Sequence, residues 1–139
     1  LIKINARSII DFSAAYDITD AKTGEKLGAA RRRGLRSTMV MDQWDVLDVN
    51  DNVIGTIIED SWIKALFRRF LSNLLPQTFN IMLGTSKENA KIVGVLRQTF
   101  NPFIAQFNVD FSMDTGNRLD RRLGIAFVIL MQFIEGRQQ

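Results

Sequence analysis

The chain has 139 residues, of which 46% are hydrophobic and 24% charged, and its formal net charge is +3. These values suit one globular domain over residues 1–139 and exclude a disordered chain or a polytopic membrane protein. The absence of cysteine and histidine removes disulfides, thiolate metal sites and the commonest catalytic bases. The modest charge excess, without a recognisable motif, also argues against a nucleic-acid binder.

The N-terminal half alternates apolar and polar residues with the period of a β-strand. Apolar residues occupy every second position from Ile10 to Ile18, and a turn at 22–25 containing Gly24 leads into a returning strand at 26–31. The same pattern predicts strands at 37–41, 44–49, 53–59, 79–83, 93–95 and 103–111. Eight short strands with short connections indicate an antiparallel meander that closes, or nearly closes, into a barrel.

Residues 119–134 do not alternate apolar and polar residues, because 123–131 form an unbroken apolar run. A helix that is apolar on every side is expected to be buried. The uncharged stretch 123–134 would span only about 18 Å as a helix, short of the roughly 30 Å hydrocarbon core of a bilayer. We therefore expect a helix enclosed by the barrel rather than a transmembrane anchor. Its predicted core residues are Phe127, Ile129, Leu130 and Phe133.

A second helix, amphipathic in character, is predicted at about 61–75, between the potential cap Ser61 and Pro76. Its apolar stripe consists of Ile63, Leu66, Phe67, Phe70, Leu71 and Leu74. The opposite face carries Lys64, Arg68 and Arg69. Such a helix either packs its stripe on the barrel as a lid, lies on an anionic membrane surface or faces a protein partner.

The order of these elements is similar to that of the tubby-like superfamily, which includes phospholipid scramblases and LURP-one-related proteins. The segment Tyr16 to Gly28 resembles the family's first hairpin, Trp44 to Asp48 followed by Val53 to Ile57 resembles a second, and 119–135 resembles its closing helix. The resemblance implies a β-barrel around a hydrophobic C-terminal helix. From tubby domains it also implies a phosphoinositide headgroup as the type of ligand, without transferring any site residue. The chain lacks the cysteine cluster of scramblases, which argues against lipid scrambling.

Four arginines lie close together at Arg31, Arg32, Arg33 and Arg36. The planar guanidinium fork suits phosphate oxygens, so an anionic headgroup is one interpretation of the cluster. The others are a solvated edge strand protected by charge and a contact with a protein partner. In an extended strand Arg31 and Arg33 would share one face and Arg32 the other.

The acidic residues before the last helix are a weak calcium candidate, centred on Asp110 and Asp114. An EF-hand loop starting at Asp110 would need Gly at its sixth position and Glu at its twelfth, where this chain has Thr115 and Arg121. Asn117 and Asp120 are better explained as cap and first-turn residues of the helix, and no metal or other cofactor is expected.

Neither a phosphate-binding GxxxxGK[ST] loop nor a GxSxG nucleophile elbow occurs, so catalysis is not expected. The leading hypothesis is a cytoplasmic, non-catalytic module that binds anionic phospholipid or phosphoinositide headgroups peripherally. The residues predicted to carry this binding are Arg31, Arg32, Arg33, Arg36, Lys64, Arg68 and Arg69. The alternatives are a soluble interaction or scaffold domain that uses the 61–75 helix, and a scramblase-like lipid transporter.

Overall fold

The computed structural model describes residues 1–7, 14–33, 43–59, 77–86, 88–99 and 106–135. Within these ranges eight strands are followed by one helix, and the bounds of these elements are β1 (Ile2–Ala6), β2 (Ala15–Asp20), β3 (Lys26–Arg32), β4 (Gln43–Leu47), β5 (Val53–Glu59), β6 (Thr78–Leu83), β7 (Lys91–Thr99), β8 (Gln106–Asp110) and α2 (Arg121–Glu135). The strand predicted at 37–41 and the helix predicted at 61–75 lie outside the described residues.

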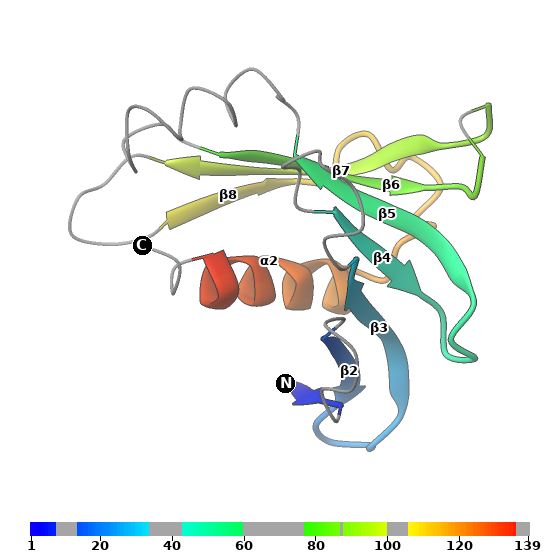
Figure 1. Ribbon diagram of the computed structural model, residues 1–139, viewed down its shortest axis with the longest axis vertical. Helices are drawn as coiled ribbons and strands as arrows, with labels where there is room; N and C mark the ends of the chain where they lie inside the picture. The colour runs from blue at the N-terminus through cyan, green and yellow to red at the C-terminus, as the bar shows by residue number, and fades with distance from the viewer. Residues whose placement is uncertain (8–13, 34–42, 60–76, 87, 100–105, 136–139) are drawn as a thin grey trace.

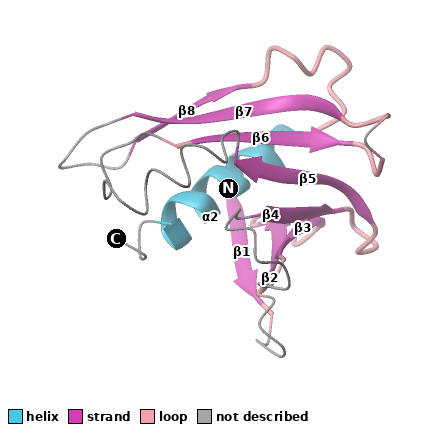
Figure 2. Ribbon diagram, turned by 45° about the horizontal axis from the view of Figure 1, so that its top comes forward, coloured by secondary structure: helices cyan, strands magenta, loops and turns pink. Residues whose placement is uncertain are grey.

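The eight strands form one antiparallel sheet in the order β1-β2-β3-β4-β5-β6-β7-β8, which confirms the predicted meander. The sheet curls through 227°, so it makes a half-barrel rather than a closed cylinder. Figures 1 and 2 show α2 lying on the concave side of this curl. The helix contacts β3 in the sheet and both edge strands, β1 and β8.

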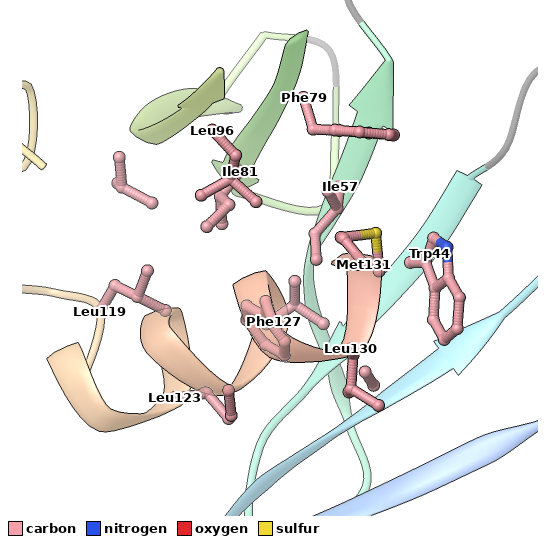
Figure 3. Close-up of a cluster of buried hydrophobic side chains, with 14 of the residues drawn as sticks. Trp44, Ile57, Phe79, Ile81, Leu96, Leu119, Leu123, Phe127, Leu130 and Met131 are labelled. Atoms are coloured by element: carbon pink, nitrogen blue, oxygen red, sulfur yellow. The ribbon is translucent and has the colours of Figure 1, made fainter. Parts of the chain in front are cut away.

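Among the described residues, a hydrophobic core fills the space between α2 and the concave face (Figure 3). Trp44 of β4, Ile57 of β5 and Phe79 of β6 are fully buried there, and Phe127 and Met131 of α2 pack against the same cluster. A fully buried Leu or Phe side chain contributes about 1.5–3 kcal/mol relative to an exposed one. The mixed strand and helix membership of the cluster shows that sheet and helix stabilise each other.

The start of α2 is fixed by Asp120, which was expected in the first turn of the helix and instead caps it. Its Oδ1 accepts a hydrogen bond from the backbone N–H of Arg122 at 2.9 Å, while its carbonyl accepts the N–H of Gly124 at 3.0 Å. Arg122 in turn donates from Nη1 to Oδ2 of Asp20 at 2.8 Å, which ties the helix start to the β2–β3 turn. Asn117, the predicted cap residue, does not cap the helix through this contact, because its side chain accepts a hydrogen bond from the Arg121 side chain at 2.9 Å.

Two glycines allow α2 to approach the sheet around the ring of Phe111. A Cβ atom at Gly124 would lie 2.5 Å from Cζ of Phe111, and one at Gly94 of β7 would lie 3.0 Å from Cδ1 of the same ring. A contact under 3.0 Å, as at Gly124, forces a neighbour to move, whereas the 3.0 Å contact at Gly94 is tight but needs only a small shift. The ring is therefore held closely between a strand and the helix.

The prediction that α2 is enclosed on all sides is wrong for one of its faces. Phe127 and Leu130 are buried as expected, but Ile129 is 48% and Phe133 57% exposed. Ile125, one turn before Ile129, is also exposed. The physical reason is the 227° curl, because a half-barrel does not surround the helix as a closed barrel would.

Candidate anion-binding site

The arginine run enters the sheet through β3, which pairs with β2 on one side and β4 on the other. The predicted edge strand is therefore wrong, because β3 is interior to the sheet. In the β3–β4 register Arg31 lies opposite Asp45, and Arg32 lies opposite Trp44. Trp44 belongs to the core, so Asp45 and Arg31 face the convex side of the half-barrel and Arg32 the concave side.

Asp45 joins Arg31 and Arg33 into one cluster on that convex face. Arg31 donates from Nε at 3.2 Å and from Nη2 at 2.8 Å to Oδ2 of Asp45. Arg33 donates from Nε at 2.7 Å to Oδ1 of the same carboxylate, and its Nη2 also lies 2.7 Å from Oδ1. The two guanidinium groups thus hold opposite oxygens of a single carboxylate.

Burial within this cluster is unequal. The Asp45 side chain is only 5% exposed, whereas those of Arg31 and Arg33 are 43% and 50% exposed. A buried carboxylate is tolerated only when it is paired and hydrogen-bonded, and here two cations meet that need. Counted over the described residues, the two arginines and Asp45 together carry one unit of net positive charge, and solvent reaches both arginine side chains.

The other predicted binding residues do not join this cluster in the part of the chain that the structure describes. Arg32 is half-buried on the opposite face of the sheet, as the alternation of an extended strand requires. Arg36, Lys64, Arg68 and Arg69 lie outside the described residues.

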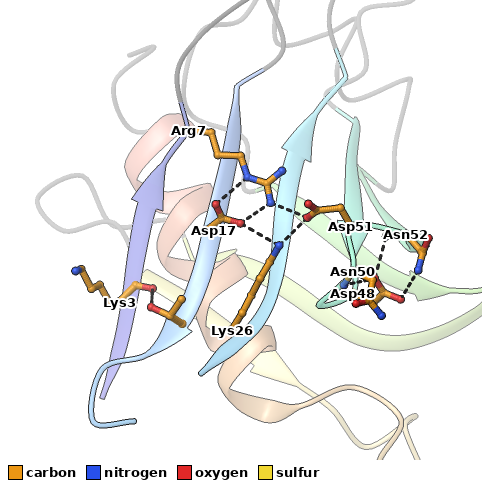
Figure 4. Close-up of polar contacts among 9 residues, drawn as sticks. Lys3, Arg7, Asp17, Lys26, Asp48, Asn50, Asp51 and Asn52 are labelled. Atoms are coloured by element: carbon orange, nitrogen blue, oxygen red, sulfur yellow. Dashed lines mark hydrogen bonds and ion pairs between the residues drawn. The ribbon is translucent and has the colours of Figure 1, made fainter. Parts of the chain in front are cut away.

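A second charged cluster is electrically neutral (Figure 4). Arg7 donates from Nε to Asp17 at 2.8 Å and from Nη2 to Asp51 at 2.6 Å, and Lys26 donates to Asp51 at 2.8 Å. Hydrogen bonds from Arg7 and then Lys26 lower the pKa of Asp51 to about 2, and the bond from Arg7 is the main cause that lowers the pKa of Asp17. Two cations balance two carboxylates, so this cluster joins β1, β2, β3 and the β4–β5 turn without offering excess charge to a ligand.

The carboxylates of the calcium candidate, Asp110 and Asp114, accept hydrogen bonds from other groups of the protein. Oδ1 of Asp114 accepts the backbone N–H of Arg118, and Oδ2 accepts the N–H of Leu119 and Nη1 of Arg121, all at 3.0 Å. Burial alone raises the pKa of Asp114, but these hydrogen bonds lower it overall. Asp110 accepts the N–H of Ser112 at 2.9 Å. Among the described residues no group of three or more acidic side chains is arranged to hold a metal ion.

The α2 stripe, defined as Ile125, Ile129 and Phe133, is a second surface of interest. These residues recur every four positions, so they lie along one side of the helix. The sequence shows that they are apolar but gives no sign of their exposure. In the described part of the chain no helix is both long enough and apolar enough to cross a bilayer.

Sequence reasoning found Arg31 and Arg33 but missed Asp45. The available signal was an acidic residue between Trp44 and Val46 in a strand pattern, at a position that must face away from the core. Comparison of the chain with protein-family models, with curated proteins and with solved structures gives no match. The geometry of the sites is therefore the basis on which function is inferred.

Proposed function

We propose that the protein is a non-catalytic, tubby-like module that binds anionic phospholipid headgroups at a membrane surface. The observation that carries this proposal is the Arg31–Asp45–Arg33 cluster, in which one buried carboxylate holds two half-exposed guanidinium groups side by side. The curled sheet with a C-terminal helix is consistent with the tubby-like resemblance, and the sequence motifs add to that support.

The expected affinity is modest. Each basic residue close to an anionic membrane contributes about 1 kcal/mol, which corresponds to roughly fivefold in the binding constant. Attraction between exposed charges weakens as salt is added, because the Debye length falls to about 8 Å at physiological ionic strength. Binding through this cluster is therefore reversible and sensitive to salt.

Co-sedimentation with liposomes tests the proposal. Wild-type protein should sediment with phosphatidylserine or phosphoinositide liposomes at low salt and remain in solution with phosphatidylcholine alone. Arg33→Gln should weaken sedimentation roughly fivefold. Arg118→Gln is the matched control, because Arg118 has the same charge, is 47% exposed and lies beside the buried Asp114. Failure of the wild type to sediment with any anionic liposome at low salt would refute the proposal.

A soluble interaction domain is the second candidate, and the α2 stripe favours it. Apolar side chains aligned along one exposed side of a helix are typical of a surface that packs against another polypeptide. Ile129→Ser would then weaken self-association or partner binding while leaving liposome sedimentation unchanged. Sedimentation velocity of wild-type and variant protein measures the self-association directly.

A further inference from the structure

We infer that Asp45 is a positioning residue that turns Arg31 and Arg33 into a fixed guanidinium pair selective for a phosphate monoester, whether on a lipid or free in solution. This inference rests on the proposed function and deepens it. It separates recognition of a defined phosphate group from attraction to any negatively charged surface.

The orientation of the guanidinium groups is the first argument. Arg31 and Arg33 both face the carboxylate with their Nε and Nη2 atoms. In a planar guanidinium this leaves the outer edge, formed by Nη1 and the second hydrogen of Nη2, directed away from Asp45. That edge can donate two parallel hydrogen bonds to a phosphate. Arg33 has one further, long contact, from Nη1 to Oε1 of Gln43 at 3.5 Å.

Preorganisation is the second argument. A free arginine side chain has about 2 kcal/mol of rotamer entropy to lose when a ligand fixes it. Asp45 has already restricted both side chains, so binding of an anion loses less side-chain entropy.

The residues next to the cluster on the neighbouring strands are small. Ala15 of β2 lies opposite Arg31, and Thr56 of β5 lies opposite Asp45.

The number of acceptor oxygens is the third argument. A phosphate monoester has three terminal oxygens and a charge of about −1.5 to −2 at neutral pH, so it can engage two guanidinium groups at once. A phosphodiester, as in phosphatidylserine, has only two terminal oxygens and a single charge. The pair should therefore prefer a headgroup that ends in a monoester, such as phosphatidic acid.

The test compares phosphatidic acid with phosphatidylserine in phosphatidylcholine vesicles matched for total surface charge. Wild-type protein should bind the phosphatidic acid vesicles at least tenfold more tightly. The double variant Arg31→Lys with Arg33→Lys keeps both positive charges but loses both planar guanidinium groups and their paired hydrogen-bond donors. It should lose the tenfold preference while binding phosphatidylserine within twofold of the wild type. Arg118→Lys, the matched control, should retain the preference.

Asp45→Asn provides a second variant with an opposite expectation. It raises the net charge by one unit, so simple electrostatic attraction would strengthen binding to both kinds of vesicle. The inferred role of Asp45 instead requires the phosphatidic acid preference to fall while phosphatidylserine binding holds or rises. Thermal melting of each variant confirms that the fold persists. Soluble glycerol phosphate that displaces the protein from phosphatidic acid vesicles would identify the free monoester as a ligand too.

Two results would overturn the inference in distinguishable ways. Equal binding of wild-type protein to both kinds of vesicle, or a lysine variant that keeps the preference, would show that the arginines act only as charges. The proposed function would survive that outcome. Binding to neither vesicle at low salt would remove the proposed function and the inference together.

Discussion

Phe127 and Phe133 of α2 offer a matched test of how the helix sits against the sheet. Both are phenylalanines in the same helix, but Phe127 is fully buried and Phe133 is 57% exposed. Truncating a buried phenylalanine to alanine typically costs about 3–5 kcal/mol, because apolar contacts are lost and a cavity remains. We expect Phe127→Ala to fall in this range and Phe133→Ala to cost less than about 1 kcal/mol.

These free energies translate into melting temperatures that are easy to separate. Unfolding entropy near 60 °C is about 2.1 cal/mol/K per residue, so for a chain of 139 residues 1 kcal/mol shifts the melting temperature by roughly 3 °C. Phe127→Ala should therefore melt about 10–17 °C lower than wild type, and Phe133→Ala no more than about 3 °C lower. Urea denaturation of the two variants gives the free energies directly. Equal losses, or a larger loss for Phe133→Ala, would refute the described orientation of α2.

Two further predictions concern packing and pH. Gly124→Ala should lower the free energy of unfolding by about 1 kcal/mol, because the clash of the new Cβ with Phe111 outweighs the gain in helix propensity. Adding Phe111→Leu should relieve that clash, so the double variant should lose less stability than the sum of the two single variants. Losses of stability that simply add would contradict this. The pKa values of Asp17 and Asp51 are both lowered, so the stabilisation from these carboxylates is present above about pH 4 and weakens in more acidic solution. The contribution of Asp51, whose pKa is about 2, is lost as pH falls towards that value. In Arg7→Gln the melting temperature should therefore fall less steeply than in the wild type as pH is lowered below about 4. An unchanged pH dependence of the melting temperature would count against the proposed role of the Arg7 contacts.

The alternation of apolar and polar residues predicted the strands best where a short turn connects two neighbouring strands. The strand at 53–59 matches β5 residue for residue, and the turn before β3 has the predicted glycine, with Gly24 at a φ of 73°. β1 was missed because it has only five residues, with Ile2 and Ile4 as its apolar positions. A run that short carries little periodic signal, and its place is set by pairing with β2.

The exposed side of α2 could not be predicted from hydropathy. Ile125, Ile129 and Phe133 are as apolar as the buried residues between them, so the sequence alone indicated burial on every side. Their exposure depends on how far the sheet curls, a property of strand twist and register along the whole meander.

The same limit applies to the candidate site. The alternation of Arg31 and Arg33 was readable from the sequence, but their shared partner was not. Asp45 is 12 residues from Arg33 along the chain, and only the β3–β4 register places it between the two arginines. A shift of that register by one residue would turn Asp45 towards the core and separate the cluster.

The most direct test of the central claim is to observe the arginine side chains while the protein meets lipid. Nε–Hε signals of arginine can be followed by nuclear magnetic resonance as bicelles containing an anionic lipid are added, with neutral bicelles as the control. We expect the signals of Arg31 and Arg33 to shift first and in a saturable manner, whereas that of Arg118 stays in place. Shifts of equal size at all three arginines, or none at Arg31 and Arg33, would contradict it.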